Sequence, residues 1–200
     1  MMRTALLTCL LLLHGALLPA AETPRVRPAE WAQPVIGTAL DNCYRVSADL
    51  YRSEQPDQRD LPGLKMLGIR SVVSLYEFFP DSRAFEQAGF QLFRHRMAAG
   101  SVTEEDLRRV LASIRDAPKP VLVHCWHGSD RTGAVVAAYR IAFQGWSQDQ
   151  AIDELVNGGY GFHASTYPNI VKLIRSLDVG KLKQVAASAA PGGTDGPVGR

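Results

Sequence analysis

Apolar residues recur along the middle of the chain with two spacings, one typical of strands and one typical of amphipathic helices. Short β-branched or alternating runs predict strands at residues 44–47, 50–53, 69–76, 90–94 and 121–124. Helical spacing, capping residues and helix-ending glycines or prolines predict helices at residues 60–67, 82–88, 103–117, 132–143, 147–157 and 167–177. This alternation of strands and helices predicts a single α/β/α layered domain built on one sheet.

The clearest of these helices follows Thr103. Its apolar residues Leu107, Val110, Leu111 and Ile114 have the spacing i, i+3, i+4, i+7, which places them on one face. Thr103 is a preferred capping residue, and acidic residues fill the first turn, where the helix dipole favours negative charge. The pattern predicts an amphipathic helix with one buried face.

The N-terminal end of the chain has a different composition. Arg3, an apolar stretch from Ala5 to Leu18 and the small residues 19–21 are typical of a cleaved secretory signal peptide, so we assign residues 1–21 to it. The apolar stretch is too short to span a bilayer, and we expect no stable membrane insertion after cleavage. The protein is then exported, to the periplasm if the source is a Gram-negative bacterium and otherwise as a secreted protein.

The remainder divides into three segments. Residues 22–42 begin with a stretch rich in Pro, Arg and Ala and predict an N-terminal arm or linker. Residues 43–185 form the predicted domain, which is long enough for one hydrophobic core. Residues 186–200, rich in Ala, Gly and Pro without periodicity, predict a disordered tail. We expect the domain to be a monomer.

Charge and cysteine content narrow the classes of function. The net charge is +2 at pH 7 and no stretch concentrates Lys or Arg, which argues against nucleic acid as a partner. After removal of the signal peptide only Cys43 and Cys125 remain, too few for the disulfide framework of a small secreted domain. A bridge between these two cysteines stays open, and it would block any chemistry that depends on a thiolate.

Residues 121–133 combine an apolar strand, a short loop and the start of an apolar helix near Thr132. Five residues separate Cys125 from Arg131 in this loop. They are Trp126, His127, Gly128, Ser129 and Asp130. Backbone N–H groups of such a loop, here from residues 126–131, can turn inward around an oxyanion, and the helix N-terminus adds its positive end. The stretch predicts a thiolate nucleophile at the bottom of a phosphate-binding cradle.

The residue types in this loop suit attack on a phosphomonoester. The nucleophile must be a thiolate, and Cys125 can ionise where N–H groups and positive charge surround it. The planar guanidinium of Arg131 can bind two phosphoryl oxygens at once. Gly128 and Gly133 permit a tight turn and close packing that a side chain would prevent. The Thr132 hydroxyl can donate a hydrogen bond to the sulfur.

The segment His124–Gly133 reads His-Cys-x-x-Gly-x-x-Arg-Thr-Gly and resembles the signature of the cysteine-dependent protein tyrosine and dual-specificity phosphatases. Within residues 31–178, further segments are similar to an exported bacterial branch of that family; they are 50–56, 72–75, 139–146 and 158–161. The resemblance implies a cysteine-phosphatase fold with a central mixed, mostly parallel sheet flanked by helices. It also implies that Cys125 forms a phosphocysteine, that Arg131 binds phosphate and stabilises the transition state, and that no metal or cofactor takes part.

One expected residue is missing. The family's general acid is an aspartate on a loop upstream of the cysteine, and here the corresponding window, residues 93–98, contains no carboxylate. A positioned acid is worth about 10²–10⁴-fold in rate, so the gap matters. Asp130 is the favoured substitute, because Cys-x-x-Gly-x-Asp-Arg resembles phosphatases in which an in-loop aspartate is the proposed acid. The other candidates are Glu104, Glu105 and His95, which have simpler explanations as helix charges and a packing histidine.

Three other functions stay open. A phosphoinositide phosphatase could use the same loop, but such enzymes often have extra lysines where this chain has Trp126, His127 and Ser129. A rhodanese-like sulfurtransferase also places a cysteine between strand and helix, although its loop is usually one residue shorter. A phosphotyrosine-binding module could have lost its acid, but Cys125 and Arg131 are both present. We therefore predict hydrolysis of phosphotyrosine on protein substrates, with phosphoserine and phosphothreonine as further candidates.

Overall fold

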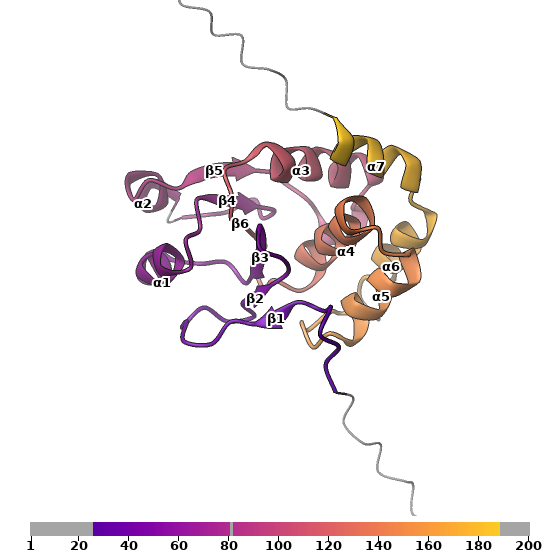
Figure 1. Ribbon diagram of the computed structural model, residues 1–200, viewed down its shortest axis with the longest axis horizontal. Helices are drawn as coiled ribbons and strands as arrows, with labels where there is room; N and C mark the ends of the chain where they lie inside the picture. The colour runs from indigo at the N-terminus through magenta and orange to yellow at the C-terminus, as the bar shows by residue number, and fades with distance from the viewer. Residues whose placement is uncertain (1–25, 81, 189–200) are drawn as a thin grey trace, which may run out of the picture.

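One six-stranded sheet organises the part of the chain that the structure describes, residues 26–80 and 82–188 of a computed structural model (Figure 1). Its strands are β1 (Gln33–Pro34), β2 (Tyr44–Arg45), β3 (Leu50–Ser53), β4 (Ser71–Ser74), β5 (Gln91–Arg94) and β6 (Val121–His124). They lie in the order β1-β2-β3-β6-β4-β5. The first two pairings are antiparallel and the other three are parallel, so the predicted mixed, mostly parallel sheet is confirmed.

Helices cover both faces of this sheet. They are η1 (Gln58–Asp60), α1 (Leu61–Met66), α2 (Ser82–Gln87), η2 (Ala99–Ser101), α3 (Glu104–Asp116), α4 (Asp130–Gln144), α5 (Gln148–Asn157), α6 (Pro168–Ser176) and α7 (Val179–Ala187). In Figure 1, α1 and α2 lie on one side of the strands, and α3 to α7 lie on the other. The predicted α/β/α layering is therefore confirmed.

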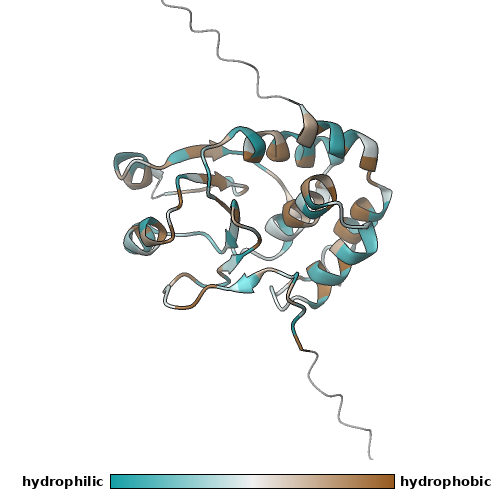
Figure 2. Cartoon of the chain, in the orientation of Figure 1, coloured by the Kyte–Doolittle hydropathy of each residue, from teal (hydrophilic) through white to brown (hydrophobic). Residues whose placement is uncertain are grey.

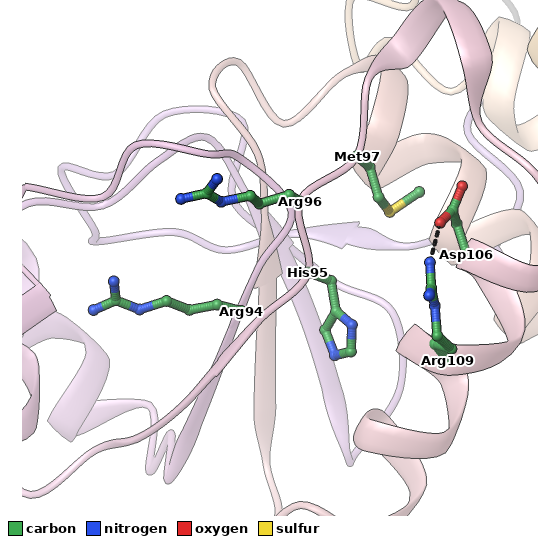
Figure 3. A pocket seen from close by; sticks show the side chains of 6 residues that line it. All are labelled: Arg94, His95, Arg96, Met97, Asp106 and Arg109. Atoms are coloured by element: carbon green, nitrogen blue, oxygen red, sulfur yellow. Dashed lines mark hydrogen bonds and ion pairs between the residues drawn. The ribbon is translucent and has the colours of Figure 1, made fainter.

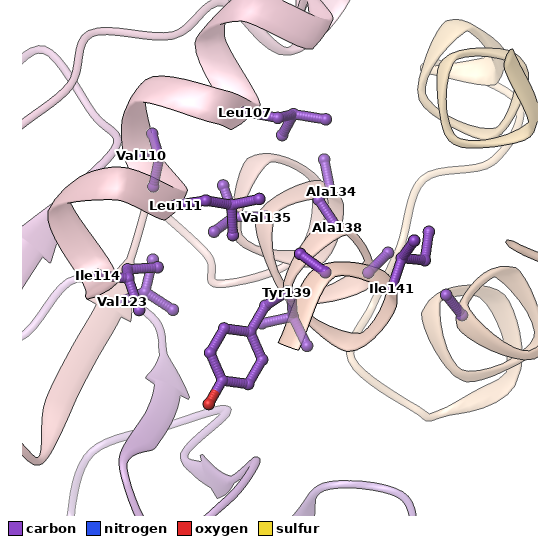
Figure 4. Packing of buried hydrophobic residues seen from close by; sticks show 14 of the residues in the cluster. Leu107, Val110, Leu111, Ile114, Val123, Ala134, Val135, Ala138, Tyr139 and Ile141 are labelled. Atoms are coloured by element: carbon purple, nitrogen blue, oxygen red, sulfur yellow. The ribbon is translucent and has the colours of Figure 1, made fainter. Parts of the chain in front are cut away.

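Alternating side chains of the central strand β6 divide the interior into two cores. Val121 and Val123 belong to the larger core beneath α3 to α7, whereas Leu122 belongs to the smaller core beneath α1 and α2. This alternation is the two-residue period of a strand buried on both faces. Figure 4 shows the apolar face of α3 directed toward α4. The helix α4 is itself largely hydrophobic (Figure 2), because it is surrounded by other elements on most sides.

Local signals predicted the helix ends well. Thr103 accepts a hydrogen bond from the Asp106 backbone N–H, and the Asp106 carboxylate accepts one from Thr103, which completes a capping box at α3. Ser147 and Gln150 form the same arrangement at α5. The predicted helix at residues 132–143 begins two residues earlier, at Asp130, so the helix includes the end of the loop.

The predicted boundary between an arm and the domain at residue 43 is wrong. Trp31 and Ala32 are buried, and β1 pairs with β2. The Ala32 N–H donates to Glu154 Oε1 on α5 at 2.6 Å. The domain therefore includes at least part of residues 22–42, because these segments bury apolar surface and complete a sheet edge despite their Pro- and Arg-rich composition.

The helix α7 was not predicted. Asp178 caps it by accepting from the Lys181 N–H, and its Leu182 is fully buried against the larger core. It extends two residues into the range that we assigned to a disordered tail. Among the described residues, no helix is both long and apolar enough to cross a membrane. The predicted signal peptide and the remainder of the tail, residues 189–200, lie outside the described ranges.

Candidate active site

The strand β6 places Cys125 at the carboxyl end of the parallel part of the sheet, which is where ligands commonly bind in α/β folds. The neighbouring strands β3 and β4 pair with β6 over its whole length, so its end is fixed from both sides. The His124 carbonyl continues this support by accepting from the Leu75 N–H at 2.9 Å. Cys125 itself is 2% exposed. The thiol therefore lies at the base of the loop on a rigid support.

Three consecutive carbonyl groups of the loop face the surrounding protein. The Trp126 carbonyl accepts from the Gln55 N–H at 2.9 Å, and the His127 carbonyl accepts from Asn42 Nδ2 at 2.8 Å. The Gly128 carbonyl accepts from Arg52 Nη2 at 2.6 Å. A peptide unit whose carbonyl faces the surrounding protein directs its N–H to the opposite side, toward the centre of the loop. These contacts explain how the backbone can form the predicted anion cradle, which the α4 N-terminus completes.

Two glycines permit this shape, as predicted. Gly128 has φ +72°, and a Cβ there would lie 2.4 Å from the Ser53 carbonyl oxygen. Gly133 lies in α4, where a Cβ would lie 2.4 Å from Leu155 Cδ1. The first glycine lets the loop approach β3, and the second lets α4 pack closely against α5.

A buried arginine behind the loop was missed as a functional residue. Arg52 is 1% exposed, and its guanidinium lies 3.7 Å from the centroid of the Tyr160 ring. Burial lowers the pKa of Arg52 to about 10, against the attraction of neighbouring groups that include Cys125, so the side chain stays charged at neutral pH. Arg52 therefore holds the Gly128 carbonyl and also adds a fixed positive charge beneath the loop. The resemblance had singled out its segment without indicating this role.

The Arg52 side chain is connected to a larger buried polar cluster. Arg140 on α4 donates to both carboxylate oxygens of Glu154 on α5, at 2.7 and 2.8 Å. Glu154 also accepts from the Tyr160 hydroxyl at 3.0 Å, and Arg27 donates to that hydroxyl at 2.9 Å. Bidentate pairing satisfies the buried charges. This cluster links the N-terminal segment, α4 and α5 to the ring that Arg52 faces.

A pocket of about 370 Å³ opens above the loop. It is lined by Tyr76, Trp126, His127, Asp130, Arg131, His163, Thr166 and Tyr167. The Arg131 guanidinium lies 4.8 Å from the Tyr76 ring centroid and donates to the Met97 carbonyl at 3.3 Å. Its Nε is buried and has no partner in the described part of the chain. Arg131 therefore lines the pocket and also retains one buried donor that the described residues leave unpaired.

The other predicted loop residues fall in different environments. Trp126 is 49% exposed and meets the Tyr76 ring edge to face at 5.0 Å, while Ser129 is buried and donates to the His127 carbonyl at 3.4 Å. Thr132 is fully buried, and its hydroxyl has no hydrogen-bond partner among the described residues. The predicted bond from Thr132 to the cysteine sulfur is therefore not formed in this structure.

Among the candidates for the acid, Asp130 is the one that lines this pocket. Glu104 accepts from the Asp178 N–H, and Glu105 forms an ion pair with Arg108. His95 bonds Ser113 Oγ at 2.9 Å and belongs to a separate cavity (Figure 3), where burial lowers its pKa. These three side chains do not line the pocket above the loop.

Asp130 is held by a residue that sequence reasoning missed. Its Oδ1 accepts from the His163 backbone N–H at 2.9 Å, and the His163 Nδ1 lies 3.0 Å from Oδ2. The two residues are far apart in the sequence, and His163 falls in the glycine-rich connection between α5 and α6, where no spacing indicated a site.

Cys43 and Cys125 are both free thiols. Cys43 belongs to the smaller core and Cys125 to the larger one, on the opposite face of the sheet. Cys43 directly precedes β2 and Cys125 directly follows β6. The strand β3 lies between these two strands, which separates the two backbones by roughly twice the 4.7–4.9 Å strand spacing, beyond the reach of a disulfide. Burial raises the pKa of the Cys43 thiol to about 11, so it is not a nucleophile at neutral pH. No group of three or more His, Cys, Asp or Glu side chains in residues 26–80 and 82–188 could hold a metal ion.

Comparisons with known proteins agree with this geometry. A model of the "Tyrosine phosphatase family" matches residues 39–164. The dual specificity protein phosphatase TpbA of Pseudomonas aeruginosa is 36% identical over 184 residues, which cover 88% of this chain and 80% of TpbA. An inositol diphosphatase of Oryza sativa is 31% identical over 158 residues, covering 74% of this chain and 68% of that protein. A crystal structure of a TpbA variant in complex with phosphotyrosine matches with a TM-score of 0.72 and 33% identity, over 82% of this chain and all of that one.

Proposed function

The chain belongs to the tyrosine phosphatase family and is a cysteine-dependent phosphatase, and from this premise we propose that it hydrolyses phosphotyrosine in proteins. The observation that carries the proposal is that the carbonyl groups of residues 126–128, beside Cys125, all face the surrounding protein and accept from donors there. The inward N–H groups suit the equatorial oxygens of a phosphoryl group, and the buried thiol lies at the end of the strand beneath them.

In this mechanism the Cys125 sulfur attacks phosphorus while the bond to the aryl oxygen breaks, which gives a phosphocysteine. Arg131 and the loop N–H groups bind the phosphoryl oxygens and stabilise the charge that they carry in the transition state. Water then attacks phosphorus, the S–P bond breaks and phosphate leaves. We assign the accompanying proton transfers to the part of the pocket lining that contains Asp130 and His163.

The lining of the pocket favours an aryl phosphate. Aromatic rings of Tyr76, Trp126 and Tyr167 line it and can contact the ring of phosphotyrosine. An inositol phosphate carries several anionic groups, but Arg131 is the one Lys or Arg side chain among the described residues that line the pocket. The bound phosphotyrosine of the TpbA complex supports the same choice by analogy.

Export and a monomeric state belong to the same proposal. The pattern of residues 1–21 supports secretion, to the periplasm in a Gram-negative source. Mass spectrometry of the purified mature protein tests this, since the expected N-terminus follows residue 20 or 21 and an intact Met1 would contradict it.

The substrate proposal is tested by phosphate release from a phosphotyrosine peptide, a phosphoserine peptide and a phosphoinositide, with Cys125→Ser as the control. We expect turnover to be fastest on phosphotyrosine, and the variant to lose at least about 10⁴-fold on every substrate because it lacks the thiolate. A faster reaction on phosphoinositide would reassign the substrate. Turnover of thiosulfate without phosphate release would indicate a sulfurtransferase, and retention of phosphopeptide without release a binding module.

A further inference from the structure

We propose that His163 is a further catalytic residue, the group that donates the proton to the leaving oxygen, and that Asp130 acts as the positioning residue for its imidazole. The proposal rests on the phosphatase function proposed above, and it assigns the proton transfer to a specific pair. It supplies a general acid in place of the upstream aspartate that the family uses, since residues 93–98 contain no carboxylate.

The two side chains form an ordered pair in the pocket wall. His163 Nδ1 lies 3.0 Å from Asp130 Oδ2 and 3.2 Å from Oδ1. The Asp130 side chain is 12% exposed, whereas that of His163 is 51% exposed, so the carboxylate lies beneath the imidazole. Because Asp130 holds Nδ1, the second ring nitrogen, Nε2, is the one left for the pocket that His163 lines.

The backbone of His163 is fixed on both sides. Its N–H donates to Asp130 Oδ1 at 2.9 Å, and its carbonyl accepts from the N–H groups of Thr166 at 3.0 Å and Tyr167 at 2.9 Å. A side chain anchored in this way at its backbone and at Nδ1 retains little freedom. Such fixation is what a group needs to transfer a proton in a defined direction.

Asp130 is less suited to donate the proton itself. Each of its oxygens is engaged by an N–H group of His163, either the backbone or the ring. A carboxylic acid that donates to a leaving group needs a free O–H directed into the pocket. The carboxylate is better placed as an acceptor that fixes the ring tautomer, with Nδ1–H donating to Asp130.

The proposed steps balance in protons and electrons. As the Cys125 sulfur forms its bond to phosphorus, the P–O bond to the aryl group breaks and the aryl oxygen takes the proton from His163 Nε2. The neutral imidazole then takes a proton from the water that attacks phosphorus. The S–P bond breaks, the thiolate returns, and His163 is again protonated. Asp130 stays ionised throughout.

Other groups face the His163 ring. The centroid of the His127 ring lies 6.3 Å from that of His163, and the centroid of the Tyr167 ring lies 6.5 Å from it. Arg131 and Asp130 line the same pocket.

The test compares His163→Asn with the wild type on a phosphotyrosine peptide and on an aryl phosphate whose phenol is strongly acidic. The Asn amide can replace Nδ1 as the donor to Asp130, but it has no proton to transfer. We expect kcat/KM, which reports the steps up to the phosphocysteine, to fall about 10²-fold or more on phosphotyrosine and less than about 5-fold on the activated substrate, because an acidic phenol leaves without protonation.

A matched control is His95→Asn, since His95 bonds Ser113 in a separate cavity, and this variant should keep the wild-type rates. A wild-type kcat/KM for His163→Asn on phosphotyrosine, or equal losses of kcat/KM on both substrates, would overturn the assignment and leave His163 a structural anchor. Absence of turnover by the wild type on both substrates would instead contradict the proposed function itself, so the two failures are distinguishable.

Discussion

The side of the 125–131 loop that faces the protein interior and the side that faces the pocket are held by different kinds of contact. On the interior side, donors from residues 42, 52 and 55 fix three successive carbonyl groups. On the pocket side, Trp126 is half exposed and Arg131 has a free buried donor. On the interior side the three carbonyl groups each have a donor from the protein, whereas the pocket side leaves groups available to a ligand.

This difference separates two roles. Buried hydrogen bonds and close packing contribute to folding, so changes on the interior side should lower stability and activity together. Exposed residues of the pocket contribute little to stability, so changes there should affect substrate binding or rate alone. The comparison can be tested by substitutions on each side.

The largest effect is expected for Gly128→Ala, on the interior side. The new methyl group would meet the Ser53 carbonyl, and the residue would keep a left-handed φ of +72°. The clash and the strained φ together should lower the free energy of unfolding by about 3 kcal/mol. Displacement of the loop should also lower kcat/KM about 10²-fold. Urea unfolding and steady-state kinetics measure both. Gly100→Ala is the matched control, since nothing lies within 4 Å of its Cβ position, and similar losses in both variants would contradict the account.

A smaller effect is expected on acidification, again from the interior side. His124 is fully buried against Phe79, and burial lowers its pKa to about 4, whereas the unfolded chain has the ordinary value of 6.5. The folded state therefore favours neutral imidazole, and its advantage is present above pH 6.5 and is lost as the pH falls toward 4. We expect a loss of about 2 kcal/mol between pH 7 and pH 5.

Urea unfolding of the wild type and of His124→Gln at both pH values measures this loss. Carboxylates with lowered pKa, such as Asp106, titrate in the unfolded chain near 3.8 and contribute little above pH 5. The variant should be less stable at pH 7 and should lose the part of the pH dependence that His124 contributes, while the lowered pKa of His95 leaves a remainder of the same sign. An equal fall in the free energy of unfolding of both proteins between pH 7 and pH 5 would show that His124 is not the source of the loss.

The smallest effect is expected for Trp126→Ala, on the pocket side. The variant loses a surface for the substrate ring, which is worth about 1 kcal/mol of binding or roughly a 5-fold rise in KM. Its stability should change by less than about 0.5 kcal/mol. Met66→Ala, an exposed apolar residue outside the pocket, serves as control. A large loss of stability in Trp126→Ala would contradict the claim that the pocket side contributes to substrate binding and not to folding.

Features set by neighbours in the sequence could be predicted from it. The strand β6, the capping boxes at Thr103 and Ser147, and the left-handed turn at Gly128 all depend on residues within one turn or one strand. The spacing of Cys125 and Arg131 belongs to the same class. Periodicity and capping report these features directly because their physical causes are local.

Features set by partners that are distant in the sequence could not be predicted from it. Ala32 is buried because Glu154 accepts its N–H, and the Pro- and Arg-rich composition around it gives no sign of that contact. The helix α7 depends on one fully buried residue, Leu182, and contains Gly180, so its own pattern is weak. His163 meets Asp130 only after α5 folds back across α4. Tertiary contacts decide all three.

The most direct test of the central claim is to trap the phosphoenzyme. The wild type is mixed with phosphotyrosine peptide, quenched within milliseconds, digested and analysed by mass spectrometry, with Cys125→Ser in parallel. We expect one phosphoryl group on the peptide that contains Cys125, appearing in a burst before steady-state release of phosphate. Phosphate release with no phosphoryl group on that peptide, or a phosphoryl group on another residue, would contradict it.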